Sequence, residues 1–176
     1  MELEYLQLIA HHDTPPLAVS AVEAVCWLEQ GRWRFRYLVE GAQKLVMPDT
    51  KEPGRADGLW RKTCFEAFVG GTHTAYREYN FAPSGQWAAY AFDSPRQGMR
   101  NADDEVEVWL EGGDDWIAVE VAVSADLAPE LPLNLTAVIE EEGGVKSYWA
   151  LAHPDGLPDF HNRDCFVAHL PSVETP

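Results

Sequence analysis

The sequence has few basic residues and no long apolar run, and both deficits narrow the range of partners. No stretch approaches the roughly 20 consecutive apolar residues that a membrane-spanning helix needs, and no export signal follows Met1. Lysine and arginine total 13 against 29 acidic residues, which gives a formal net charge of −16. Because such a surface repels phosphate backbones and anionic lipids, we expect a protein that binds neither nucleic acid nor membranes. The missing export signal predicts a cytoplasmic location.

Cysteines and the common catalytic motifs are also scarce. Cys26, Cys64 and Cys165 are odd in number and far apart, so they form neither a disulfide framework nor a Cys-x-x-Cys metal pair. The sequence contains no Gly-x-Ser-x-Gly elbow, no Walker A motif and no His-Glu-x-x-His motif. Nothing in these patterns demands zinc or catalysis, and we therefore expect a protein that is not an enzyme.

Two-residue alternation, which is typical of half-buried strands, recurs along the chain. Residues 27–41 alternate arginines with large apolar side chains, namely Trp33, Phe35, Tyr37 and Val39, around a turn at Gln30-Gly31. Further hairpins are predicted over residues 75–92, 105–124 and 133–151, with turns at Pro83-Ser84-Gly85, at residues 112–115 and at Gly143-Gly144. The chain therefore consists mainly of antiparallel hairpins.

The hairpins predict an all-β fold. Only residues 124–132 suggest a helix, and their two prolines limit it to about one or two turns. The length of 176 residues and 46% hydrophobic content suit one core, so residues 1–176 are expected to form a single domain. About nine to eleven short strands without crossover helices predict a two-sheet antiparallel β-sandwich, with a barrel as the alternative.

One acid, Glu66, lies in the middle of an apolar strand. Cys64, Glu66 and Phe68 point to one face and apolar residues point to the other, so the strand is expected to be central and Glu66 partly buried. A carboxylate away from water costs several kcal/mol unless it is paired. Glu66 is therefore either half of an ion pair or an acceptor facing a ligand. The arginines nearby in sequence are Arg55, Arg61, Arg77 and Arg96.

Aromatic residues cluster in one short region of the sequence around this strand. The cluster contains Trp60, Tyr76, Tyr79, Trp87 and Tyr90. Most of these are expected in the core, because a sandwich needs large inward side chains. Trp60 is the expected exception, since it sits at a loop-to-strand junction beside Asp57 and Gly58. An exposed aromatic plane beside polar groups suits the apolar face of a sugar or a flat cofactor.

Three segments together resemble the DOMON-like proteins related to carbohydrate-binding module family 9. They are RADGLWRKTCFEAFVG, YREYNFAPSGQWAAYAF and SYWALAHPDGLPDFHNRDCFVAHL. Leu59-Trp60 followed by CFEAFV looks like the superfamily's Trp-then-acid strand, and FHNRDCF looks like its C-terminal return. The resemblance covers roughly residues 33–170, and it departs from the family where Asn162 and Arg163 precede Asp164.

This resemblance implies a β-sandwich that binds a sugar or a haem and does no chemistry itself. For a sugar, the matching ligand-binding positions are Trp60, Arg61, Glu66, Asn80 and Arg96, with Trp149 as a second stacking tryptophan. For haem, the comparable axial set is Met99 with His153 or His161. The first reading is thus a small-ligand-binding module of the saccharide class. The alternatives are a structural or protein-interaction domain without a small ligand and a haem-binding electron-transfer domain.

A cytoplasmic ligand could also be a sugar phosphate or a nucleotide sugar. The net charge of −16 opposes such an anion unless arginines gather locally. This version of the hypothesis requires Arg55, Arg61 and Arg96 to converge on the ligand.

Overall fold

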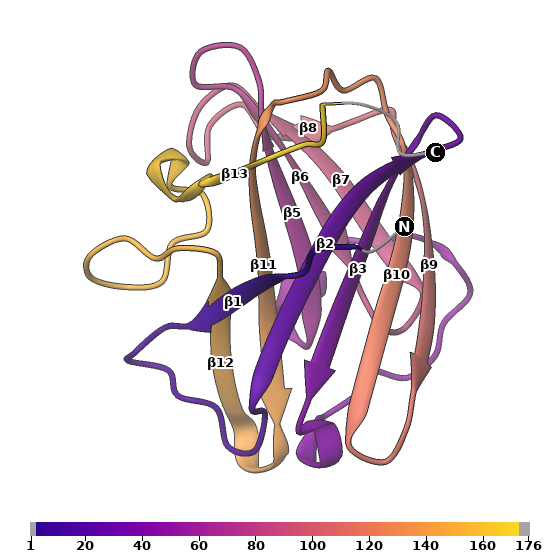
Figure 1. Cartoon of the computed structure of the whole chain (residues 1–176), viewed down its shortest axis with the longest axis vertical. Helices are drawn as coiled ribbons and strands as arrows, with labels where there is room; N and C mark the ends of the chain where they lie inside the picture. Colours follow the sequence, from indigo (N-terminus) through magenta and orange to yellow (C-terminus); the bar gives the residue numbers. More distant parts are fainter. Residues whose placement is uncertain (1–2, 173–176) are drawn as a thin grey trace.

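The computed structural model describes residues 3–172, which form thirteen strands joined by loops and 3₁₀ turns (Figure 1). The strands are β1 (Leu6–Ala10), β2 (Ala21–Glu29), β3 (Arg32–Glu40), β4 (Gly54–Arg55), β5 (Cys64–Gly70), β6 (Tyr76–Phe81), β7 (Gln86–Phe92), β8 (Arg100–Asn101), β9 (Glu105–Gly112), β10 (Trp116–Ser124), β11 (Pro132–Glu141), β12 (Val145–Ala150) and β13 (Ala168–His169). The 3₁₀ turns are η1 (Ala42–Lys44), η2 (Leu59–Arg61), η3 (Glu142–Gly144) and η4 (Arg163–Cys165). No helix within the described residues is long and apolar enough to cross a membrane.

The predicted hairpins are confirmed. Antiparallel pairs join β2 to β3, β6 to β7, β9 to β10 and β11 to β12. The helix predicted over residues 124–132 is wrong, because residues 125–131 form neither helix nor strand. Pro129 cannot donate a backbone hydrogen bond, and Glu130 adopts a left-handed φ of 62°.

The predicted two-sheet antiparallel sandwich is also wrong. The strands form one curled sheet whose main path runs β4-β7-β6-β5-β11-β12-β1-β2-β3-β10-β9, a half-barrel to which β8 and β13 add outside the path. Strand β1 makes the sheet continuous, because Leu6–Leu8 pair with β2 while Ile9 and Ala10 pair with β12. The sheet is mixed rather than antiparallel, since β4 pairs with β7 in parallel.

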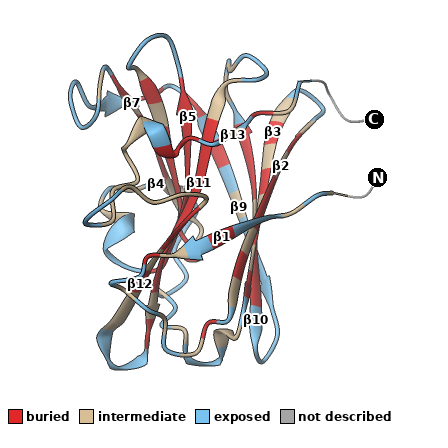
Figure 2. Cartoon of the chain, turned by 60° about the vertical axis from the view of Figure 1, so that its left-hand side comes forward, coloured by how far each residue is buried: buried red, intermediate tan, exposed pale blue. Residues whose placement is uncertain are grey.

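The core lies between the two arms of this curled sheet (Figure 2). We call β4, β7, β6, β5, β11 and β12 the β5 arm, and β2, β3, β10 and β9 the β3 arm. Tyr37 of the β3 arm packs on Phe65 with ring centroids 5.1 Å apart. Its hydroxyl donates to the carbonyl oxygen of Glu66 at 2.6 Å. The core therefore fixes the backbone of β5 at the position of the buried acid.

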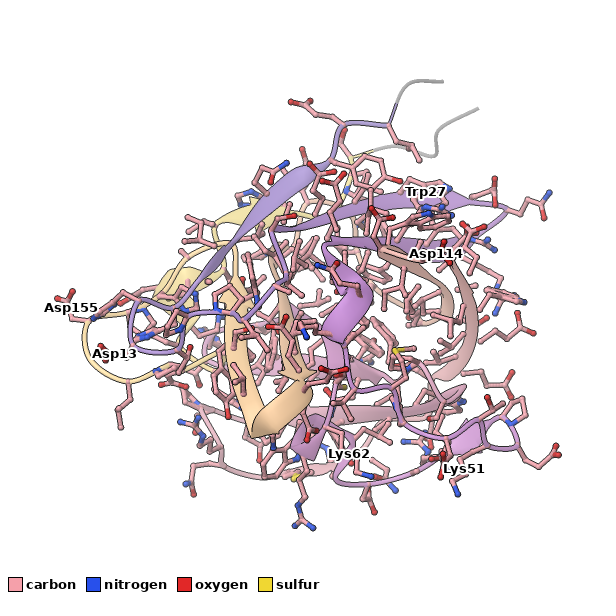
Figure 3. All side chains as sticks on the ribbon, turned by 90° about the horizontal axis from the view of Figure 1, so that it is seen from below. Asp13, Trp27, Lys51, Lys62, Asp114 and Asp155 are labelled. Atoms are coloured by element: carbon pink, nitrogen blue, oxygen red, sulfur yellow. The ribbon has the colours of Figure 1, made fainter. Side chains whose placement is uncertain are left out.

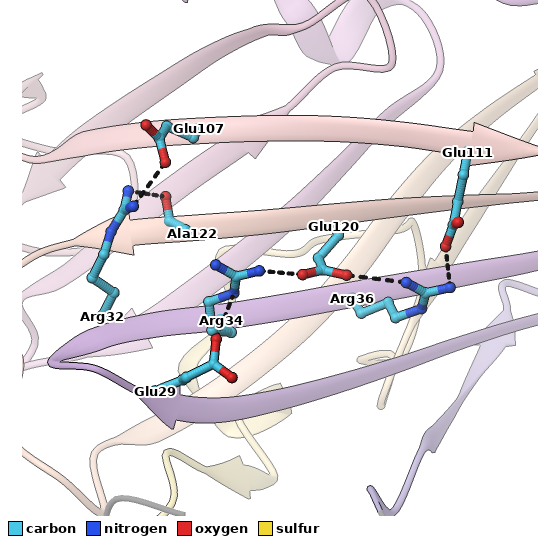
Figure 4. A network of polar contacts seen from close by, with 8 residues as sticks. All are labelled: Glu29, Arg32, Arg34, Arg36, Glu107, Glu111, Glu120 and Ala122. Carbon is cyan, nitrogen blue, oxygen red and sulfur yellow. Dashed lines mark hydrogen bonds and ion pairs between the residues drawn. The ribbon is translucent and has the colours of Figure 1, made fainter.

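The outer face of the β3 arm carries a network of ion pairs (Figure 4). Arg34 and Arg36 share the carboxylate of Glu120, and Arg36 also pairs with Glu111. These are the arginines that alternation predicted on a wet face, and their exposed pairs contribute little stability individually. Because they are already paired, they leave no free basic patch on this arm.

Two loops, residues 11–20 after β1 and residues 151–162 after β12, contact each other; Figure 3 labels Asp13 of the first loop and Asp155 of the second. The ring nitrogen Nε2 of His11 contacts the Gly156 carbonyl oxygen at 2.8 Å. The loop of residues 11–20 is also hydrogen-bonded to Glu141, the last residue of β11. Its carboxylate accepts hydrogen bonds from the backbone N–H groups of Leu17, Ala18 and Val19 at 2.6, 2.7 and 3.0 Å.

Candidate functional site

The outward face of the β5 arm, opposite the core, carries a row of polar side chains. Cross-strand register places Asn80 on one side of Glu66 and Thr136 on the other. Glu78 lies two residues before Asn80 on β6, opposite Phe68 of β5. All four polar residues are buried. The prediction that Glu66 is a buried acid in a central strand is therefore confirmed.

A cleft of about 360 Å³ opens onto this row. Its walls come from η2, the loop after β7 and the loop after β12. The lining residues are Trp60, Glu66, Glu78, Tyr90, Phe92, Arg96, Met99, Val138, Tyr148, Pro158, Phe160 and His161. The cleft thus combines an acidic floor with walls that are largely aromatic.

Trp60 stands at the rim, as the sequence predicted. Gly58, with φ of 71°, reverses the chain into η2, and the Trp60 side chain is 51% exposed. Arg61 does not line the cleft; its guanidinium stacks over the Trp60 ring at 5.4 Å from the centroid. Arg61 therefore supports the stacking residue from outside the cleft.

Glu66 and Glu78 form an acid pair on the cleft floor. Glu66 is 2% exposed and Glu78 is 6% exposed, and Glu66 Oε2 accepts from the Thr136 hydroxyl at 3.2 Å. Neither acid forms an ion pair with lysine or arginine among residues 3–172. Burial, followed by the charge of Glu78, raises the pKa of Glu66 well above its ordinary value. Burial also raises the pKa of Glu78 to about 7.

His161 touches the acid pair without neutralising it. Its Nδ1 is 2.6 Å from the Tyr76 hydroxyl, and its Nε2 is 3.7 Å from Glu78 Oε2. Burial, followed by the nearby charge of Arg96, lowers the pKa of His161 to about 4. The imidazole is therefore uncharged at neutral pH and supplies no counter-charge to the floor.

Asn80 brings unsatisfied polar atoms to the same row. Its side chain is fully buried, and neither amide atom has a hydrogen-bond partner among the described residues. The amide lies near Glu78 and lowers the pKa of that acid in part, although it is outside hydrogen-bonding geometry. Buried polar groups normally find partners, so this amide is unusual, but Asn80 is not among the residues that line the cleft.

The arginines required for an anionic ligand do not converge. Arg96 lines the cleft but pairs with Asp159 at 3.0 Å. Arg55 instead donates to the carbonyl oxygens of Ala89 and Ala102 at 2.8 and 2.7 Å. With Arg55 and Arg61 outside the cleft, the basic cluster predicted for a sugar phosphate does not form.

Of the residues considered for haem, Met99 and His161 line the cleft and His153 does not. Met99 is 57% exposed and lines the cleft with His161, but both His161 nitrogens face protein groups. His153 lies outside the cleft lining, with Nε2 2.7 Å from the Ile9 carbonyl oxygen. The described residues also contain no cluster of three or more His, Cys, Asp or Glu side chains suited to a metal ion.

Several cleft residues were not singled out by the sequence. Glu78 shares a face of β6 with Asn80, so the alternation Tyr76-Glu78-Asn80 could have identified it. Tyr148 and Phe160 arrive from segments remote in sequence, and no local pattern marks them. Trp149, the second stacking tryptophan that the resemblance implied, is in the core and donates to Ser147 Oγ at 2.8 Å.

No family model and no curated protein matches this sequence. Among solved structures, the fold is similar to the crystal structure of a protein from Bacteroides uniformis described as a "putative carbohydrate-binding protein". The match has a TM-score of 0.64 and covers 93% of this chain and 84% of that chain, with 15% sequence identity. At this identity, the similarity shows a shared fold.

Proposed function

We propose that the protein is a cytoplasmic, non-catalytic module that binds a small saccharide in the cleft of the β5 arm. The observation that carries the proposal is that the exposed Trp60 lines the same cleft as the buried acids Glu66 and Glu78. The similar solved structure, that of a protein described as a "putative carbohydrate-binding protein", supports the proposal. The resemblance to DOMON-like proteins belongs to the same proposal.

The chemistry of a pyranose suits both parts of the cleft. One face of the ring carries C–H groups that pack on an aromatic plane, as the exposed ring of Trp60 provides. The hydroxyls on the ring edge need hydrogen-bond partners in a buried site. The carboxyl groups of Glu66 and Glu78 offer acceptor atoms there, and Asn80 lies beside Glu66 on the neighbouring strand.

Replacing Trp60 with alanine is expected to weaken saccharide binding roughly tenfold or more, because removing a large aromatic anchor commonly costs more than about 1.4 kcal/mol of binding. Calorimetric titration with a panel of mono- and disaccharides measures the effect. Trp109→Ala is the matched control, since Trp109 is 46% exposed on β9, outside the cleft. Both substitutions are at exposed positions and should change stability little.

Binding that survives Trp60→Ala but fails in Trp109→Ala would move the site to the other arm. If no saccharide in the panel binds, the proposed function is wrong, and the notion of a structural or protein-interaction domain gains support.

A further inference from the structure

We propose that the ligand carries a protonated amine, so that the cleft recognises an amino sugar through the unpaired acids Glu66 and Glu78. This inference rests on the proposed function and names its ligand class. A neutral sugar needs only hydrogen-bond partners for its hydroxyls. Two adjacent buried carboxyl groups without an ion-pair partner are stabilised specifically by a positive group. The ammonium group of a ligand can supply that positive charge.

No lysine or arginine among residues 3–172 forms an ion pair with either acid, and the charge of Arg96 lowers the pKa of Glu78 only in part. Two buried carboxylates on neighbouring strands repel each other unless they hold a proton or accept a positive group. Glu66 has one hydrogen bond, from the uncharged hydroxyl of Thr136. Both acids line the cleft, so a positive group on a ligand can approach them where no side chain does.

The other polar groups around the pair compensate its charge only in part. Arg96 is the cation at the rim, and Asp159 pairs with it at 3.0 Å. The Tyr90 hydroxyl donates to Asp57, which lies outside the cleft lining. The remaining polar groups that border the floor are the uncharged side chains of Thr136, Asn80, Tyr76, Tyr148 and His161.

The aromatic walls favour a cation over an anion. An ammonium group is attracted to the faces of aromatic rings, and the attraction grows where water is excluded. Tyr90, Phe92, Tyr148 and Phe160 line the cleft together with Trp60. The net charge of −16 also raises the local concentration of cationic ligands.

Binding of a cation should therefore be linked to proton release. Below pH 7, Glu78 retains a proton in the free protein, because its pKa is raised to about 7. A bound ammonium favours the ionised carboxylate, so the proton leaves the acid pair for solvent as the amine binds. The affinity for an amino sugar should rise as the pH increases from 5.5 towards about 7.

The test compares three sugars that differ in one substituent: glucosamine, N-acetylglucosamine and glucose. Calorimetric titration of the full chain is expected to show glucosamine binding at least about tenfold more tightly than either neutral sugar at pH 7. The advantage should shrink at pH 5.5. Titrations in buffers with different ionisation enthalpies should reveal proton release for glucosamine alone.

The acids are tested by Glu66→Gln and by the double variant Glu66→Gln/Glu78→Gln. Both are expected to lose the preference for glucosamine, while Glu142→Gln, at an exposed acid on η3, should keep it. Circular dichroism verifies that each variant folds.

The outcomes separate the two proposals. Equal affinity for the three sugars, or a preference for a neutral one, overturns the amino-sugar inference and leaves saccharide binding intact. A glucosamine preference that persists in the double variant also overturns it. If none of the three sugars binds and the wider saccharide panel is silent, both proposals fail.

Discussion

The double variant Glu66→Gln/Glu78→Gln is expected to be more stable than the wild-type protein above pH 7, by on the order of 3 kcal/mol. This is the free energy corresponding to a rise in the Glu78 pKa from 4.5 to about 7, at about 1.4 kcal/mol per pKa unit. Glutamine fills a similar volume, and its amide oxygen can still accept from Thr136, but it never ionises. The gain therefore comes from removing the burial of charge.

The pH dependence has a definite sign. Between pH 4.5 and about 7, the folded protein holds a proton on Glu78 that the unfolded chain has lost. Because the native state binds more protons there, the free energy of unfolding falls as pH rises through this window. His161 acts in the opposite direction between pH 6.5 and about 4, where the unfolded chain binds the proton. The difference between wild type and variant isolates the acids.

Urea unfolding at pH 5.5 and pH 8 measures this effect through the free energy of unfolding. Glu142→Gln controls for the loss of an acid from a chain with a net charge of −16. A double variant whose stability falls in parallel with the wild type as pH rises would show that Glu66 and Glu78 are not protonated in the native state. It would also contradict the proton release proposed for ligand binding.

Replacing Glu141 with alanine is expected to lower the free energy of unfolding by about 3–5 kcal/mol. The Glu141 side chain is fully buried and accepts hydrogen bonds from three successive backbone N–H groups, those of Leu17, Ala18 and Val19. Hydrogen bonds to a charged group contribute more than neutral ones, and buried donors left without an acceptor cost free energy. Alanine removes every acceptor at once.

Urea unfolding at neutral pH measures this loss as well. Glu141→Gln should be intermediate, since its amide keeps one oxygen acceptor. The neighbouring Glu142→Ala is the control, because Glu142 is exposed and pairs with Lys44 at the surface. A loss below about 1 kcal/mol for Glu141→Ala would show that water satisfies the loop N–H groups and that Glu141 does not anchor the loop.

Local pairing could be predicted from the sequence because alternation and turn chemistry act between near neighbours. Gln30 and Gly31 both have positive φ, 52° and 73°, as a two-residue turn that matches strand twist requires. The continuity of the sheet was not predictable in this way. It depends on the five residues of β1, whose backbone divides its hydrogen bonds between β2 and β12. Side-chain alternation does not encode which two strands a short segment will join.

Part of the candidate site could be predicted from the sequence for the same reason. Glu66 lies in a strand with apolar faces, and the next strand brings Asn80 beside it. The residues of the cleft walls were harder to predict from the sequence, because they come from loops that meet only in the folded, curled sheet. His161 thus enters the cleft whereas His153 does not, although the two share one loop and no spacing rule distinguishes them.

Strand β1 also matters for behaviour at high protein concentration. An open strand edge displays a row of unpaired N–H and C=O groups, which can pair with another chain and begin aggregation. By pairing with β2 through Leu6–Leu8 and with β12 through Ile9 and Ala10, β1 covers two such edges with a single short segment. Strand β1 therefore makes these two edges unavailable for pairing with another chain. This role does not involve the cleft on the outward face of the β5 arm.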